Sequence, residues 1–120
     1  MTVTQIVPAD LFGEEWHDCE HGRELSCSSL RTLTSYLFSA GARRVVISSL
    51  SMTGIPSAKI RVIGPVCDNG YPLYVVYHVN RGQFSRLSSK DKQQFVNRLK
   101  ELTEYKTLSH RVYAVLGISK

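Results

Sequence analysis

Cysteine is scarce in this chain of 120 residues and does not recur in a regular pattern. The three cysteines are Cys19, Cys27 and Cys67. An odd number of widely spaced cysteines does not form a disulfide framework, so we expect reduced thiols in a reducing compartment. A single disulfide between Cys19 and Cys27 is the alternative if the protein is exported.

Long apolar runs are also missing. The longest, residues 45–47 and 71–79, have the length of strands and fall short of the roughly 20 residues of a membrane-spanning helix. Residues 1–12 have neither a basic start nor a long apolar middle, so they do not resemble a secretory signal. We therefore expect an intracellular, cytoplasmic protein.

Known catalytic and phosphate-binding frames are absent from the sequence. There is no G-x-S-x-G, and the stretch GIPSAK lacks the frame of a phosphate-binding loop. Gly64 and Gly70 do not form a dinucleotide-binding fingerprint either. We therefore expect a protein that acts by binding and is not an enzyme.

Acidic residues are rare outside the first 25 positions. Residues 1–25 hold six acids and one arginine, a net charge of −5, whereas residues 26–120 hold 14 basic and four acidic residues, a net charge of +10. A basic body of this kind suits a polyanion or an acidic protein surface. With 42% apolar residues, the chain has enough material for one ordinary core.

The stretch EEWHDCEHGRELSC is the exception to this basic character. In an extended segment side chains alternate, so His17, Cys19 and His21 would share one side. Cys27 could complete the tetrahedron of ligands that zinc prefers. The spacing is not a recurring zinc pattern such as C-x-x-C, and no second ligand pair follows. We therefore interpret the segment first as an acidic arm whose Trp16 packs on the body, and second as a zinc site.

Catalysis by this segment is the third interpretation. The acidic arm is the segment at residues 9–25, and the acids that we assign to it as candidate contacts are Glu14, Glu15, Asp18, Glu20 and Glu24. A general acid–base pair needs burial or a neighbour that separates two pKa values, whereas these acids cluster on a segment typical of solvated surface. Cys19 lies among acids, which disfavours its thiolate. We therefore expect no catalytic residue, no metal and no cofactor, with zinc at His17, Cys19, His21 and Cys27 as the alternative.

Two stripes of apolar residues predict helices. The first is Leu30, Leu33, Leu37 and Phe38, and the second is Phe95, Val96, Leu99 and Leu102. Ser26 or Ser28 would cap the first helix, and Gly41 follows its end. Ser88, with Asp91 three residues later, resembles a capping box at the start of the second helix.

Five segments rich in β-branched or aromatic residues predict strands: residues 2–7, 43–50, 58–66, 71–80 and 111–118. The expected order is β–α–β–β–β–α–β, with two helices on one face of a largely antiparallel sheet. This order is similar to a ferredoxin-like arrangement with an extra strand. We expect a single α+β domain over residues 1–120, with an acidic N-terminal segment at residues 9–25.

Nucleic-acid binding has the best physical support among the candidate functions. Lys59 and Arg61 share one face of a predicted strand, and Tyr74 and His78 share one face of the next. Arginine and lysine bind phosphates, and exposed rings stack on bases. The predicted contact residues are Arg43, Arg44, Lys59, Arg61, Tyr74, His78, Arg81, Arg86, Lys90 and Lys92.

The competing hypothesis is a protein-binding inhibitor or adaptor that blocks a nucleic-acid-handling machine. The acidic arm would then imitate phosphates towards a basic partner, or the basic body would cover an acidic one. The strand predicted at residues 2–7 could also pair with the sheet edge of a second copy and form a homodimer.

Overall fold

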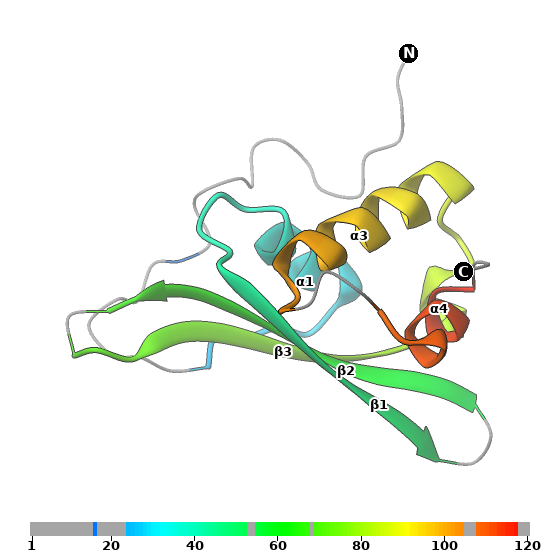
Figure 1. Ribbon diagram of the computed structural model, residues 1–120, viewed down its shortest axis with the longest axis horizontal. Coiled ribbons are helices and arrows are strands. Elements are labelled where there is room, and N and C mark those ends of the chain that lie inside the picture. Colours follow the sequence, from blue (N-terminus) through cyan, green and yellow to red (C-terminus); the bar gives the residue numbers. More distant parts are fainter. Residues whose placement is uncertain (1–15, 17–23, 53–54, 68, 105–107, 118–120) are drawn as a thin grey trace.

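In the part of the chain that the structure describes, three antiparallel strands form a sheet. The computed structural model describes residues 16, 24–52, 55–67, 69–104 and 108–117 (Figure 1). The strands are β1 (Arg44–Met52), β2 (Ile55–Val66) and β3 (Pro72–Asn80), and they lie in the order β1-β2-β3. Each strand therefore pairs with its neighbour in the sequence, and β2 is central.

Within the described residues four helices accompany the sheet, and the three longest begin at a serine cap. They are α1 (Leu30–Leu37), α2 (Arg81–Phe84), α3 (Ser89–Leu102) and α4 (His110–Leu116). The hydroxyls of Ser29, Ser88 and Ser109 each accept a hydrogen bond from a backbone N–H three residues later. Such a cap satisfies one of the N–H groups that have no partner within a helix. Among the described residues, no helix has the length and apolar content needed to cross a membrane.

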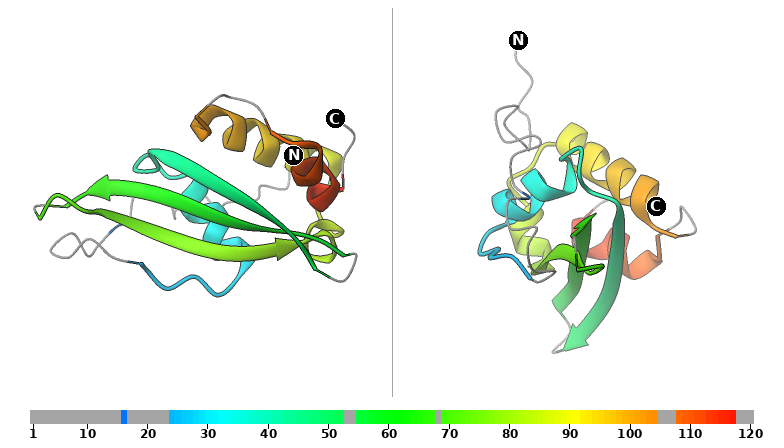
Figure 2. Two further views of the ribbon diagram at one scale, coloured as in Figure 1. Left: turned by 60° about the horizontal axis from the view of Figure 1, so that its bottom comes forward. Right: turned by 90° about the vertical axis from the view of Figure 1, so that its left-hand side faces the viewer.

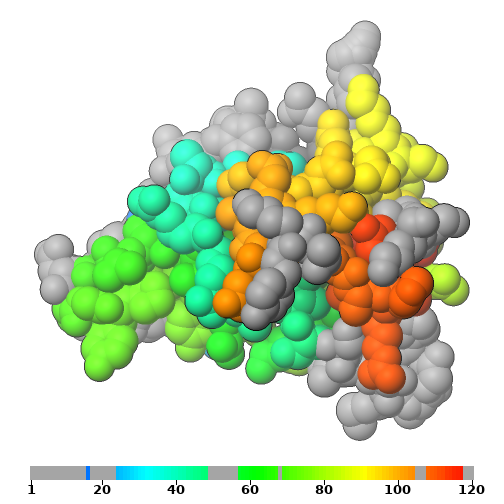
Figure 3. Space-filling model, viewed as in Figure 1, coloured from blue at the N-terminus to red at the C-terminus, as the bar shows by residue number. Residues whose placement is uncertain are grey.

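One hydrophobic core joins the sheet to these helices. The sheet contributes Val45, Ala58, Ile60, Val62, Val75 and Val79, and the helices contribute Leu33, Leu37, Phe84, Phe95, Val96, Leu99, Val112, Val115 and Leu116. Val45, Val62 and Val75 are paired across the three strands, and Ala58 is paired with Val79, so these sheet residues belong to one face. Helices α3 and α4 lie on one side of the strands (Figure 2). In Figure 3 their yellow to red atoms lie at the centre and right of the surface, beside the teal to green atoms of the strands.

Arg98 of α3 ties this helix to the end of α1. Its Nε donates a hydrogen bond of 2.9 Å to the Leu37 carbonyl, and its Nη2 donates one of 3.2 Å to the Ser39 carbonyl. The last carbonyls of a helix lack partners within the helix. The guanidinium therefore satisfies carbonyls at the end of α1 and fixes the position of α3 beside it.

Trp16 is held in a slot beside the same end of α1. Its Nε1 donates a hydrogen bond of 2.7 Å to Ser39 Oγ, and its ring packs edge-on to Tyr36 with the centroids 4.7 Å apart. A Cβ built on Gly41 would lie 2.6 Å from the indole, and one built on Gly64 would lie 2.4 Å from it. The indole therefore needs glycine on both sides, and the predicted packing of Trp16 on the body is confirmed.

The predicted α+β class and the antiparallel sheet are confirmed, but the predicted order of elements is wrong in its last element. Residues 110–116 form α4, where a strand over 111–118 was expected. The pattern of Val112, Tyr113, Val115 and Leu116 fits a helical face, since all four are buried. Ser109 caps this helix and Gly117, with φ 73°, ends it, so local capping outweighs β-branched propensity.

The ferredoxin-like expectation is not met by the described strands. That arrangement requires a crossover through a helix between parallel strands, whereas β1, β2 and β3 follow one another without a crossover. The helix α2, which follows β3 directly, was not predicted. The strand predicted at residues 2–7 lies outside the described residues.

We predict that Gly64→Ala costs about 1–3 kcal/mol of unfolding free energy, because the new methyl group would overlap the indole of Trp16. The same change in a Trp16→Ala background should cost much less, since the slot is then empty. Urea unfolding of the four proteins of this double-mutant cycle measures the coupling. An equal cost in both backgrounds would show that Gly64 does not accommodate Trp16.

Candidate nucleic-acid interface

The sheet face opposite the core carries a regular grid of side chains. Three rows of paired residues cross the strands: Arg44, Ile63 and Tyr74; Val46, Arg61 and Val76; and Ser48, Lys59 and His78. We call these nine residues the basic face. Arg44, Ser48 and His78 are exposed, and the other six are partly exposed. The face therefore reaches solvent across all three strands.

The composition of the basic face favours an anionic partner. Three of its nine residues are cationic, namely Arg44, Lys59 and Arg61, and none is acidic. The antiparallel register places Lys59 opposite His78. The Lys59 and Arg61 pair therefore lies on the same face as the Tyr74 and His78 pair, although the sequence assigned them only to separate strands. The positive charges are therefore concentrated on β1 and β2, and the rings lie on β3.

Arg61 and Tyr74 form a preorganised pair within this face. The guanidinium carbon of Arg61 lies 5.2 Å from the centroid of the Tyr74 ring, which is the geometry of a cation–π contact. The Nε of Arg61 is buried and has no hydrogen-bond partner among the described residues. The pair thus holds a cation over a ring, and the Nε–H of Arg61 remains a donor without a partner among the described residues.

The end of the acidic arm lies against the same part of β3. The Leu25 N–H donates a hydrogen bond of 2.8 Å to the Tyr74 carbonyl, and Glu24 forms a parallel bridge with Tyr74. The side chain of Glu24 is exposed. A carboxylate is therefore positioned at the outer edge of β3, beside the basic face.

The other predicted contact residues lie elsewhere. Arg43 is exposed just before β1, and its N–H donates to the Ile63 carbonyl at 2.8 Å. Arg81, Arg86, Lys90 and Lys92 gather around α2 and the start of α3. Both Lys92 and Arg81 lie beside Gly117, within 4 Å of a Cβ built there, at the end of α4. Cations at a helix C-terminus stabilise the helix dipole, which gives these two a structural role.

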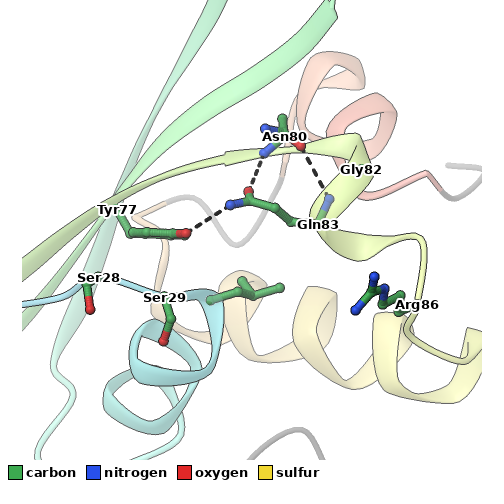
Figure 4. Close-up of a pocket in the computed structure, with 8 residues that line it drawn as sticks. Ser28, Ser29, Tyr77, Asn80, Gly82, Gln83 and Arg86 are labelled. Carbon is green, nitrogen blue, oxygen red and sulfur yellow. Dashed lines mark hydrogen bonds between the residues drawn. The ribbon is translucent and has the colours of Figure 1, made fainter.

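An open surface pocket of about 410 Å³ lies next to this second group. It is lined by Ser28, Ser29, Leu30, Tyr77, Asn80, Gly82, Gln83 and Arg86. Figure 4 shows Gln83 between Asn80 and Tyr77: its Oε1 accepts from the Asn80 N–H at 2.7 Å, and its Nε2 donates to Tyr77 Oη at 2.9 Å. The first of these bonds, together with the bond of 3.3 Å that the Gln83 N–H donates to Asn80 Oδ1, forms the capping box that starts α2. Much of the polar lining therefore serves the fold, and the N-x-x-Q spacing at residues 80–83 was the signal that sequence reasoning missed.

The zinc hypothesis falls largely outside the described residues. His17, Cys19 and His21 are not among them, nor are Glu14, Glu15, Asp18 and Glu20. The described part of the chain contains no group of three or more histidine, cysteine or acidic residues that could hold a metal ion. Cys27, the fourth candidate ligand, is a half-buried free thiol that packs against the core.

Comparisons with known proteins give no indication of the function of this chain. A scan against protein-family models, a search of curated proteins and a search of solved structures each find no match to this chain. The basic face is therefore judged on the chemistry of its own residues.

We predict that Cys27 reacts slowly with thiolate-specific reagents at neutral pH. Burial raises the pKa of its thiol to about 11, and the charge of Glu24 adds to the rise. The folded state therefore keeps the proton in the range above pH 9 where an unfolded cysteine has largely lost it, so unfolding becomes easier as pH rises through this range. Iodoacetamide rates in a Cys19→Ser/Cys67→Ser variant should have a midpoint near pH 11 when folded and near pH 9 in denaturant. Coinciding midpoints would refute the burial effect.

Proposed function

We propose that this protein is a small, intracellular, non-catalytic binding protein whose basic face contacts nucleic acid or a nucleic-acid-bound protein. The observation that carries the proposal is the grid itself, in which three cations and two rings share one solvent-reaching sheet face without an acid. Cations neutralise phosphates and release their counterions, and rings offer stacking surfaces to bases. The net charge of +10 over residues 26–120 would attract a polyanion from a distance.

The first test reverses two charges of the basic face that project from different strands. Arg44→Glu with Lys59→Glu should weaken binding to random oligonucleotides on the order of tenfold or more at 0.1 M salt. The slope of log affinity against log salt should become shallower by about one unit for each lost phosphate contact. Fluorescence anisotropy across a salt series measures both quantities.

The matched control is Arg31→Glu with Arg111→Glu. These residues are exposed, lie in the first turns of α1 and α4, and are not part of the grid. The control changes the net charge by the same amount, and an acid in the first turn suits a helix. Equal weakening by both variants would mean that total charge and not the basic face determines binding. Unchanged affinity in the Arg44/Lys59 variant would exclude this face as the site.

A protein-binding inhibitor or adaptor is the second candidate function. The observation that favours it is that the acidic arm is attached to the body at two described points, Trp16 in its slot and Leu25 on β3. An acidic segment fixed in this way suits a basic protein surface, because complementary charge gives specificity and speeds association.

Neutralising the arm separates the two functions. Deletion of residues 1–25 is unsuitable because it removes both Trp16 and Leu25, which pack against the core. The amide variant, in which Glu14, Glu15, Asp18, Glu20 and Glu24 become Gln or Asn, keeps these anchors. Nucleic-acid affinity should stay equal or increase, because the variant has lost negative charges that repel phosphates. A loss of nucleic-acid affinity would contradict the proposed function, and loss of binding to an immobilised polylysine probe alone would support the second candidate.

A further inference from the structure

We infer that the basic face takes single-stranded nucleic acid in preference to a duplex. This inference rests on the proposed function and adds the class of ligand. It follows from three properties of the face: its rings, its apolar positions and its width.

The rings of the basic face require unpaired bases. In a duplex the flat faces of the bases are stacked on one another, whereas single strands can turn them towards aromatic side chains and arginine planes. The guanidinium carbon of Arg61 lies 5.2 Å from the centroid of the Tyr74 ring, so a ring and a cation are already in contact there. A base that packs on this pair gains contact without the cost of ordering Arg61 first.

The apolar positions point to the same ligand. Ile63 lies between Arg44 and Tyr74 in one row, and Val46 and Val76 flank Arg61 in the next. All three are only partly buried. Phosphates gain nothing from such positions, whereas the flat faces of unpaired bases lose water-exposed area against them. A face that bound only backbone phosphates would not need them.

The width of the sheet disfavours duplex. The major groove of DNA is about 12 Å wide and admits a helix or a ribbon of two strands. Three strands span roughly 10 Å between the outer backbones alone, before side chains are added, because neighbours lie about 4.8 Å apart. The grid occupies all three strands. The whole face therefore cannot enter a groove, whereas a single strand can lie across it.

The spacing of the rings sets a minimum ligand length. Tyr74 and His78 are four residues apart on β3, which corresponds to roughly 13 Å at about 3.3 Å per residue. One base that stacks at Tyr74 does not reach His78. Contact with both rings therefore requires more than one nucleotide, and Lys59, paired opposite His78, lies beside the second ring.

The test compares one random 12-nucleotide sequence as single strand and as duplex, for both RNA and DNA, by fluorescence anisotropy. The wild-type protein should prefer the single strand by at least tenfold. Tyr74→Leu should lose roughly ten- to hundredfold in single-strand affinity, as expected for a lost stacking contact, and Tyr74→Phe should keep it. Duplex affinity, which depends on charge, should be the same in all three.

Tyr71→Leu is the matched control, because Tyr71 is a 67% exposed tyrosine that precedes β3 and lies outside the grid. It should leave both affinities unchanged. Equal affinity for single strand and duplex, with no effect of Tyr74→Leu, would overturn the inference but leave the proposed function in place. Absence of binding to either form at low salt would instead contradict the proposed function. Thermal unfolding of each variant shows whether an affinity loss reflects loss of fold.

Discussion

The alternation of side chains along β2 is the constraint on which both the fold and the candidate site depend. Ala58, Ile60 and Val62 enter the core, and the residues between them, Lys59 and Arg61, reach the opposite face. A slip of one residue in the pairing of β2 would bury two cations and expose the apolar set. The burial of the core residues therefore also fixes which residues of β1 and β3 lie beside the cations.

Much of this arrangement could be predicted because its signals are local. Alternation in residues 58–66 and 71–80 gave the correct faces for Arg61 and Tyr74, and Ser88 correctly indicated where α3 begins. The pairing of Lys59 with His78 could not be predicted, since register depends on contacts between strands. α4 was missed because its short apolar segment, VYAVL, is compatible with both a helical and a strand period. Only the caps at Ser109 and Gly117 distinguish the two.

The slot of Trp16 illustrates why non-local features escape a reading of the sequence. Gly41 and Gly64 are 23 residues apart, and each has an ordinary local explanation as a turn residue or an irregularity in a strand. Only the packed structure shows that both make room for one indole, and that Ser39 receives its N–H. The same end of α1 also receives Arg98. The segment that carries the acids is thus attached where α1, α3 and β2 meet.

This attachment links the acidic arm to the basic face through the backbone. The hydrogen bond from Leu25 to Tyr74 uses an edge carbonyl of β3, so a carboxylate at Glu24 lies beside the ring that carries Arg61. The charge of Glu24 opposes phosphates near Tyr74 but does not affect the apolar contact of an uncharged base. In the proposed complex, this repulsion would lower the affinity for any ligand that places a phosphate near Tyr74. The contact of a base with Tyr74 would then supply affinity that charge alone does not supply at this edge of the sheet.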